Sequence, residues 1–319
     1  MRTDLLPTNS ATELDEAVRR AVALLEAGEP VALPTETVYG LAADAMSPSA
    51  AAKIFEAKAR PSLDPLIVHL PNRDWLDRIA RVEWELVGDL IEHFWPGPLT
   101  LVLPRREIVP DIITSGLETV AVRMSAHPVF KAVIERFGRP LAAPSANRFG
   151  RVSPTTAQHV RDGLGGRIPL VVDGGPCAVG IESTIVEVDG DSITILRPGP
   201  ITADMLAPFG EVMVAVAGET PDAPGQLQSH YAPRTPLRFV GEAVQGAAGL
   251  LAWRAARAGF AAVEVLSETG DLTEAAATLF AKMRRLDDLG LDVIVADPVP
   301  EHGLGVAIMD RLRKAAAHV

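Results

Sequence analysis

The chain has 319 residues, of which 48% are hydrophobic and 22% are charged, as in most globular proteins. Its net charge is −11, and acidic residues outnumber basic ones both up to residue 210 (27 against 20) and after it (14 against 10). Neither half therefore carries the positive charge typical of a nucleic-acid-binding protein. The single cysteine, Cys177, excludes an internal disulfide and a thiolate metal cage within one chain.

The sequence shows no sign of membrane insertion or export. No apolar run approaches the roughly 18 residues that a membrane-spanning helix needs. The first residues also lack the basic stretch and apolar core of a signal peptide. We therefore expect a protein of the reducing cytoplasm, without membrane association, and its length favours two domains.

The first two thirds of the chain have an α/β pattern. Apolar residues at helical spacing predict a helix over 14–27, with Thr12 as its N-cap and Gly28 as its end. Further helices are expected over 49–59, 83–94 and 127–137, and strands over 30–34, 66–70, 99–103, 119–124, 170–172, 184–188 and 193–196. Because several strands follow one another without a helix, we expect an open, twisted, mixed sheet.

The prolines and glycines of residues 209–236 indicate a linker between two domains, one over 1–208 and one over 237–319. In the second domain, strands are expected over 237–240, 248–253, 262–266 and 293–296, and helices over 271–286 and 305–317. This pattern predicts a small Rossmann-like α/β domain, long enough for three layers.

Polar side chains gather where the expected strands end. The strand over 30–34 runs into Thr35, Glu36 and Thr37, which place two hydroxyls and a carboxylate where a solvent turn favours Asn, Gly or Pro. Arg123 ends another strand, and an arginine there indicates either a salt bridge or an anion ligand. Strand ends are where open α/β sheets bind ligands.

Lys58 and Arg60 lie at the end of an expected helix. If the chain turns there, as Pro61 favours, both cations can converge on one phosphate. Otherwise they are cations at a helix C-terminus that favour its dipole. His69 shares a strand face with Ile67, where it is either a hydrogen-bonded core residue or a functional one.

Further strand ends carry similar groups. Ser145 and Asn147 follow a run of small residues, Ser153 precedes a helix start that it could cap, Ser183 enters a strand and Arg197 leaves one. Each alone also fits an ordinary turn or salt bridge, so it is their repetition that predicts a ligand pocket. The chain contains no Walker A, dinucleotide-binding, HExxH or GxSxG motif.

With these motifs in order, the chain resembles the threonylcarbamoyl-AMP synthases of the YrdC type, in their long form with an extra C-terminal domain. The resemblance rests on residues 34–41 (PTETVYGL), 58–61, 65–66, 69, 95–100, 122–123, 144–147, 182–184 and 197–199, and on residues 229–233 (SHYAP), 303–305, 307–308 and 310–312 as marks of the long form. It implies a YrdC-like catalytic domain over 1–208, a linker that acts as a lid over 209–236, and a C-terminal domain without a recognisable catalytic constellation.

The resemblance implies a nucleotidyltransferase that joins L-threonine, bicarbonate or CO2, and ATP into threonylcarbamoyl-AMP and pyrophosphate. A separate complex then transfers the threonylcarbamoyl group to tRNA. This reaction needs no protein nucleophile, only the positioning of two anionic reactants and neutralisation of charge on phosphate. Mg2+ is expected with ATP, held by phosphate oxygens and water without protein ligands.

The resemblance also implies roles for particular residues. Lys58, Arg60 and Arg123 are expected to be catalytic, and the fork of Arg123 suits the threonine carboxylate. The expected threonine site consists of Thr35, His69, Arg123, Ala143 and Ser183. The expected ATP site consists of Lys58, Arg60, Thr119, Ser145, Asn147, Ser153, Arg197 and Tyr231.

Two residues raise separate questions. Tyr231 either pins the linker to one of the domains or, as the resemblance implies, packs against the nucleotide beneath a lid that excludes water. Asp64 stands where the family often has Asn or His. Near a triphosphate, its carboxylate must be turned away or paired with Lys58, Arg60 or a metal.

Two other functions are weighed against the synthase. An RNA-binding module would use the cations near Arg136, Arg139, Arg148 and Arg151, but the negative charge of both halves disfavours tight direct tRNA binding. A carbamoyl-transfer enzyme similar to the YrdC-like part of hydrogenase maturation proteins would need acylphosphatase and zinc-finger parts. The chain has neither the length nor the cysteines for them.

Overall fold

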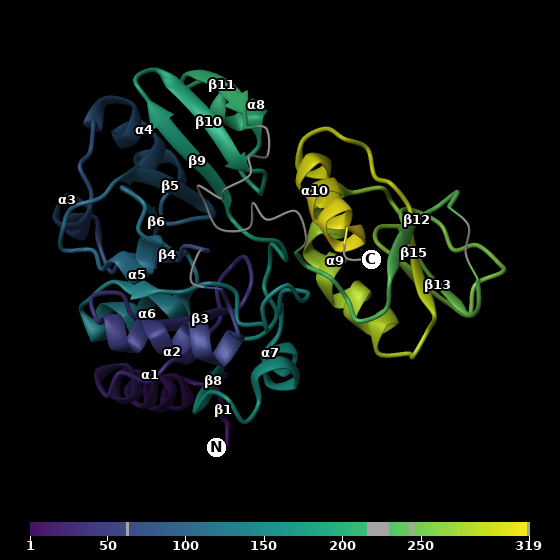
Figure 1. The fold of residues 1–319 in the computed structure, drawn as a ribbon, viewed down its shortest axis with the longest axis horizontal. Helices are drawn as coiled ribbons and strands as arrows, with labels where there is room; N and C mark the ends of the chain where they lie inside the picture. The colour runs from purple at the N-terminus through teal and green to yellow at the C-terminus, as the bar shows by residue number, and fades with distance from the viewer. Residues whose placement is uncertain (62–63, 216–229, 243–244, 318–319) are drawn as a thin grey trace.

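The chain folds into two sheet-based domains, seen side by side in Figure 1. The computed structural model describes residues 1–61, 64–215, 230–242 and 245–317. Within these residues, the helices are all too short or too polar to cross a membrane.

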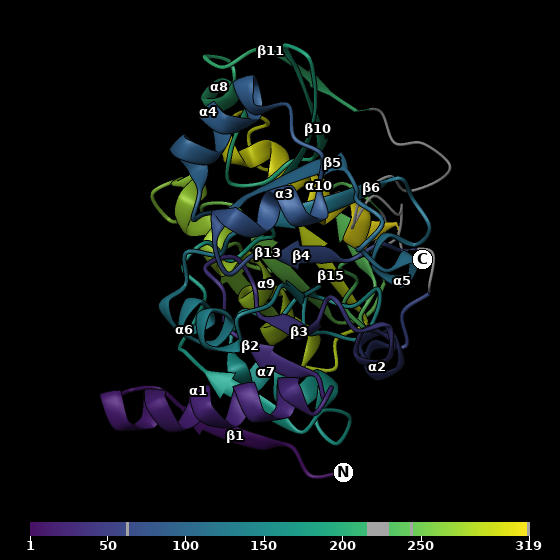
Figure 2. The ribbon, with the colours of Figure 1, turned by 90° about the vertical axis from the view of Figure 1, so that its left-hand side faces the viewer.

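An eleven-stranded sheet forms the N-terminal domain, in the order β1-β8-β2-β3-β7-β4-β6-β5-β9-β10-β11. Figure 2 shows β1 at one edge of this sheet and β11 at the other. Neighbouring strands include parallel pairs, such as β4 with β6, and antiparallel pairs, such as β5 with β6, so the expected mixed sheet is confirmed. The strands are β1 (Asp4–Pro7), β2 (Val31–Leu33), β3 (Gly40–Asp44), β4 (Ile67–His69), β5 (Leu99–Pro104), β6 (Thr119–Arg123), β7 (Leu141–Ala142), β8 (Leu170–Asp173), β9 (Thr184–Asp189), β10 (Ser192–Arg197) and β11 (Glu211–Val214).

Helices cover both faces of this sheet, because side chains along a buried strand alternate between faces. Val31 and Leu33 of β2 pack in a cluster with α1 and α6, whereas Ala32 between them packs in the cluster that contains α2 and α4. The helices are α1 (Ala11–Glu26), α2 (Pro48–Lys58), the 3₁₀ helix η1 (Arg73–Trp75), α3 (Leu76–Ile79), α4 (Trp84–Phe94), α5 (Asp111–Thr114), α6 (Pro128–Phe137), α7 (Ala157–Leu164) and α8 (Ala203–Leu206).

The elements that the sequence predicted in this domain are present, with three corrections. The N-cap of α1 is Ser10, which forms a capping box with Glu13, so Thr12 was the wrong residue. Strands β1 and β3 were not predicted, since β1 is short and β3 is rich in Gly and Ala, which have low strand propensity. Strand β11 lies inside the range expected to be a linker and pairs in parallel with β10.

The C-terminal domain has a four-stranded parallel sheet in the order β12-β15-β13-β14. Its elements are β12 (Leu237–Phe239), β13 (Ala248–Ala252), β14 (Ala262–Val265), α9 (Leu272–Asp287), β15 (Val293–Ala296) and α10 (Leu304–Ala316). Both helices lie on the face of the sheet that is turned towards the N-terminal domain (Figure 1). The domain therefore has two layers and not the three that were expected, because a loop without a helix joins β13 to β14.

The two domains share one apolar cluster. Val38, Val152 and Ile181 of the N-terminal domain belong to the same buried cluster as Phe280 of α9. Gly180 has a φ of 78° and lies so close to α9 that a Cβ there would come within 2.5 Å of the helix backbone. The second domain thus packs directly behind the loop that leads into β9.

Candidate active site

A cavity lies at the ends of β4 and β6, where several loops of the N-terminal domain meet the start of the described C-terminal segment. It is lined by Thr35, Thr37, Val38, Gly40, Arg60, Ile67, His69, Arg123, Ala143, Pro144, Ser145, Glu182, Ser183, Arg197, His230 and Tyr231. Nine of the thirteen predicted site residues are among them. The other four, Lys58, Thr119, Asn147 and Ser153, do not line this cavity.

The stretch PTETVYGL is the connection of a β-hairpin. Residues 34–39 join the antiparallel strands β2 and β3. Thr35 holds this loop from within: its hydroxyl donates to the carbonyl oxygen of Val38 (2.6 Å) and accepts from the backbone N–H groups of Thr37 (3.1 Å) and Val38 (3.2 Å). Gly40 lets the hairpin approach Ala143, because a Cβ there would lie 3.3 Å from that of Ala143. The loop is therefore preorganised on one wall of the cavity.

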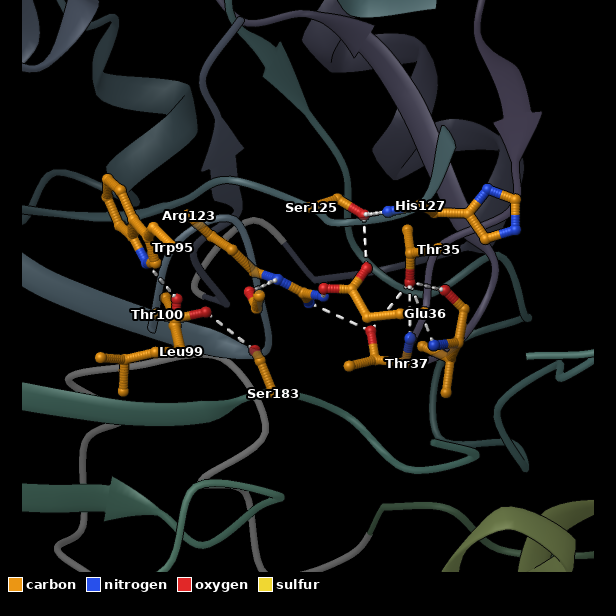
Figure 3. Close-up of polar contacts among 12 residues, drawn as sticks. Thr35, Glu36, Thr37, Trp95, Leu99, Thr100, Arg123, Ser125, His127 and Ser183 are labelled. Carbon is orange, nitrogen blue, oxygen red and sulfur yellow. Dashed lines mark hydrogen bonds and ion pairs between the residues drawn. The ribbon is translucent and has the colours of Figure 1, made fainter. Parts of the chain in front are cut away.

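Arg123 is buried at the end of β6 with three partners, shown in Figure 3. Its Nη2 forms an ion pair with Glu36 Oε1 (2.6 Å), Nη1 donates to Thr37 Oγ1 (3.0 Å), and Nε donates to the carbonyl oxygen of Gly97 (3.2 Å). Arg123 thus forms the salt bridge that one interpretation of the sequence proposed. It also lines the cavity, where the other interpretation places an anion ligand.

The sequence pattern placed the Glu36 carboxylate at a strand end but predicted no role for it. Its second carboxylate oxygen accepts from the hydroxyl of Ser125 at 2.5 Å. Burial raises the pKa of Glu36, but the charge of Arg123 and the hydrogen bonds from Ser125 and Arg123 outweigh it and hold that pKa at about 2. Glu36 is therefore ionised at neutral pH and fixes the orientation of the Arg123 fork.

His69 lines the cavity together with Ile67, as the strand alternation predicted. It pairs with Arg123 in the β4–β6 register, and its ring lies 4.7 Å from that of Phe130. Burial and then the charge of Arg123 lower the pKa of His69 to about 3, so the ring is neutral at physiological pH. Among the described residues its Nδ1 has no hydrogen-bond partner, which leaves that atom for a ligand.

Lys58 and Arg60 are both buried, and Lys58 is the last residue of α2, so its place at a helix C-terminus is confirmed. The expected turn is also present, because Ala59, with a φ of 51°, ends the helix before Arg60. Lys58 Nζ donates to the carbonyl oxygens of Ser145 and Asn147. Burial lowers the pKa of Lys58 well below its usual value.

Arg60 faces the cavity with its charge balanced by Asp64. Its Nη2 forms an ion pair with Asp64 Oδ2 at 2.9 Å, and Nε donates to the Asp64 carbonyl oxygen at 3.1 Å. The carboxylate that departs from the family pattern is therefore paired with Arg60, one of the arrangements that the sequence left open.

Ser183 and Arg197 connect the two sides of the cavity. Arg197 donates to the carbonyl oxygen of Ser183 through Nε (3.1 Å) and Nη2 (2.9 Å), and Nη2 also lies 3.1 Å from Ser183 Oγ. That hydroxyl lies 2.8 Å from Thr100 Oγ1 (Figure 3). These contacts tie the guanidinium of Arg197 to the start of β9.

Ser153 does not cap a helix, because α7 begins at Ala157 and its N-cap is Thr156. Its hydroxyl donates instead to Glu182 Oε1 at 2.5 Å, directly behind the cavity wall. Glu182 lines the cavity, and sequence reasoning gave it no role. Its position beside Ser183 in the matched motif was the signal available.

Tyr231 pins the linker, as one of its two interpretations required, whereas its packing against a nucleotide stays a prediction. Its ring stacks on Phe280 of α9 (5.6 Å) and meets that of His230 (4.2 Å), which pins the linker to the C-terminal domain. The same side chain lines the cavity, and among the described residues its hydroxyl has no hydrogen-bond partner. Most of the expected lid, residues 216–229 with Ser229, lies outside the described residues.

Thr119 and Asn147 lie away from the cavity. Thr119 begins β6, four residues before Arg123. Asn147 Nδ2 donates to the carbonyl oxygens of Arg148 (2.8 Å) and Arg151 (2.7 Å), so its amide shapes the loop that contacts Lys58. Among the described residues there is also no group of three or more His, Cys, Asp or Glu side chains able to hold a metal ion.

Comparison with known proteins shows the family of this chain. Residues 23–199 match a family model described as telomere recombination, and residues 201–317 match one described as the C-terminal domain of threonylcarbamoyl-AMP synthase. The chain belongs to the threonylcarbamoyl-AMP synthase family. The resemblance seen in the sequence, including the long two-domain form, is thus confirmed.

Relatives of this family match the chain from end to end. It is 40% identical to the threonylcarbamoyl-AMP synthase of Pyrococcus abyssi over 94% of either chain. It is 41% identical to that of Bacillus subtilis over 98% of this chain and 95% of the relative. The solved structure of P. abyssi Sua5 complexed with L-threonine is similar over 100% of this chain and 98% of its own, with a TM-score of 0.90 and 37% identity.

Proposed function

We propose that this chain is a nucleotidyltransferase that makes threonylcarbamoyl-AMP and pyrophosphate from L-threonine, bicarbonate or CO2, and ATP. The observation that carries the proposal is the cavity itself. It combines a buried, oriented arginine fork with two further buried guanidinium groups, on a chain similar throughout its length to synthases of this name.

In this proposal, one side of the cavity holds threonine. Arg123 supplies the guanidinium for the threonine carboxylate, and its ion pair with Glu36 and its bond to Thr37 fix its direction. Neutral His69 can exchange a hydrogen bond with the threonine hydroxyl or the carbamate. The solved relative with bound L-threonine, at 37% identity, supports threonine as the amino acid.

The other side of the cavity holds the phosphates of ATP. The threonine amine captures CO2 and loses a proton, and an oxygen of the resulting carbamate attacks the α-phosphorus as the bond to pyrophosphate breaks. Arg60 and Arg197 face the place where this charge develops, and Lys58 holds the carbonyl oxygens of Ser145 and Asn147 behind it. Cations that are already fixed in a site with little water stabilise such charge without a rearrangement of protein or solvent during the reaction.

Mg2+ fits this proposal as a partner of ATP. The carboxylate that lines the cavity, Glu182, is already paired with Arg311. Glu36 and Asp64, behind the arginines of the cavity, are paired with Arg123 and Arg60. The ion would therefore be held by phosphate oxygens and water, where it would neutralise charge on the triphosphate.

ATP entry requires the linker residues to move. The cavity has a volume of about 50 Å³, whereas ligand pockets usually measure about 300 Å³ or more. His230 and Tyr231 occupy its mouth and are buried. We infer that they yield when the nucleotide binds and then close over it, which would protect the mixed anhydride from water.

The product would pass to a separate complex that modifies tRNA, and we place the reaction in the cytoplasm, where its reactants and acceptor meet. The net charge of −11 favours this handover over tight direct tRNA binding.

The test is pyrophosphate release by the full chain with Mg-ATP and bicarbonate, in the presence of threonine, serine or no amino acid. Release that requires threonine and bicarbonate, with the mass of threonylcarbamoyl-AMP, supports the proposal. Release indifferent to threonine, or no turnover, contradicts it.

A further inference from the structure

Arg311 of α10 reaches from the C-terminal domain to the wall of the cavity. Its side chain is fully buried, with 0% exposed. Nε forms an ion pair with Glu182 Oε2 at 2.8 Å, and Nη1 donates to the carbonyl oxygen of Pro198 at 2.9 Å. The guanidinium also lies over the ring of Tyr231, 5.1 Å from its centre. One residue of the second domain thus contacts three segments that build the site.

Its partner Glu182 is a buried carboxylate in the cavity wall. Ser153 donates to one carboxylate oxygen and Arg311 pairs with the other, so both oxygens are occupied. A buried carboxylate without a cation is costly, and it would draw the nearest guanidinium towards itself. On the cavity side that guanidinium belongs to Arg197, which already contacts the next residue, Ser183.

The balance of charge around the cavity depends on Arg311. Three ion pairs cancel there, namely Arg60 with Asp64, Arg123 with Glu36, and Arg311 with Glu182. Asp310 also pairs with Arg311 and with Lys314, which adds one charge of each sign and leaves this balance unchanged. Removal of Arg311 therefore makes the set more negative by one charge and leaves Glu182 without its cation.

We propose that Arg311 is a positioning residue of the synthase site, which acts through Glu182 to keep the phosphate side of the cavity positive and the 182–183 segment in register with Arg197. The proposal rests on the proposed function and gives the C-terminal domain a part in nucleotide binding. The alternative is that Arg311 only holds the two domains together. The two roles differ in what happens when the charge of Glu182 is removed along with that of Arg311.

The experiment measures binding of a non-hydrolysable ATP analogue and steady-state kinetics in the full chain. Arg311→Met should weaken analogue binding and raise the KM for ATP at least tenfold, with the KM for threonine changed less than threefold. The double variant Glu182→Gln, Arg311→Met also removes the carboxylate charge that the single variant leaves unpaired, and the amide introduced at position 182 keeps an acceptor for the Ser153 hydroxyl. It should therefore recover analogue affinity to within about threefold of the wild type. A structural role alone predicts no such recovery.

Arg313→Gln is the matched control, because it removes a cation from the same helix, where Arg313 forms an exposed pair with Glu301. It should leave both KM values unchanged. The dependence of analogue binding on salt should be weaker in Arg311→Met than in the wild type, since one cation has left the site. If Arg311→Met does not fold, the double variant and Arg311→Lys are compared with the wild type in the same binding assay, and their analogue affinities distinguish the two roles of Arg311.

Unchanged ATP affinity in Arg311→Met, or a double variant as impaired as the single one, would overturn the proposal. The binding assay also separates this proposal from the function on which it rests. A wild type that binds the analogue but makes no threonylcarbamoyl-AMP would refute the function while the Arg311 comparison still stands. A wild type that binds no analogue would refute both.

Discussion

The two sides of the cavity are held in different ways. On the side proposed for threonine, Thr35, His69 and Arg123 all come from the N-terminal domain, and Arg123 is oriented by a carboxylate and a hydroxyl of the neighbouring hairpin. On the side proposed for phosphate, Arg197 contacts the oxygens of Ser183, and Arg311 of the second domain pairs with the neighbouring Glu182.

Under the proposed function, the amino-acid site is complete within one domain, whereas the nucleotide site depends on contact between two. The domain contact is extensive, since Val38, Val152 and Ile181 share an apolar cluster with the second domain. Truncation before the second domain would therefore expose this apolar surface in addition to removing the linker.

The largest expected effect is on the threonine side. Arg123→Ala should lower kcat/KM for threonine at least 100-fold, because the carboxylate fork is lost. It should also destabilise the fold by about 3 kcal/mol, since Glu36, whose side chain is only 13% exposed, is left without its cation. Steady-state kinetics and urea unfolding measure the two effects.

Arg136→Ala is the control for that change, because Arg136 forms a solvent-exposed pair with Asp15. Its loss should cost about 1 kcal/mol or less. A threonine KM within threefold of the wild type in Arg123→Ala would remove Arg123 from the threonine site.

Lys58→Met tests the phosphate side. We expect kcat/KM for ATP to fall about 30-fold, with threonine binding unchanged, because the lysine charge acts next to the segment that carries Ser145. Stability should suffer much less than activity, since the buried ammonium is costly in the folded state, as its lowered pKa indicates. An equal loss in the ATP and threonine parameters would argue against separate sides.

The pH dependence of stability tests the neutral state of His69. Its pKa is about 3 in the folded protein, against about 6.5 in the unfolded chain. Between these values the unfolded chain binds a proton that the folded protein does not, so stability falls as the pH drops below 6.5, by up to about 1.4 kcal/mol per pH unit. From pH 6.5 to 5 this histidine should cost about 2 kcal/mol.

Comparing wild type with His69→Asn in urea unfolding at several pH values isolates that effect, because the other histidines titrate in both proteins. The variant should show the shallower decline below pH 6.5. Identical pH profiles would mean that the pKa of His69 is the same in the folded protein as in the unfolded chain.

The smallest effect is expected at Thr119. The family resemblance places it near the nucleotide, although it does not line the cavity. We expect Thr119→Ala to raise the KM for ATP about threefold and to leave the KM for threonine unchanged. An unchanged ATP requirement would confine the nucleotide site to the cavity and the linker.

Local pattern accounts for much of what could be predicted. Periodic apolar residues indicated α1, α4 and α6, and β-branched runs indicated β6 and β8. Strand β3 was missed because Gly and Ala in GLAAD have little strand propensity, and its place is decided by pairing with β2 and β7. The strand alternation that put His69 beside Ile67 was correct for the same local reason.

By itself the sequence determined the α/β pattern, the family and nine residues of the cavity wall. The periodicity of apolar residues, the turn residues and the order of the motifs all depend on residues close together in the chain. Only the tertiary structure decided how the charges are paired. Arg123 meets Glu36 of the loop between β2 and β3, and Arg311 meets Glu182 across 129 residues of chain. A buried ion pair between distant segments cannot be predicted from a periodic sequence pattern, since it depends on which strands and domains pack together.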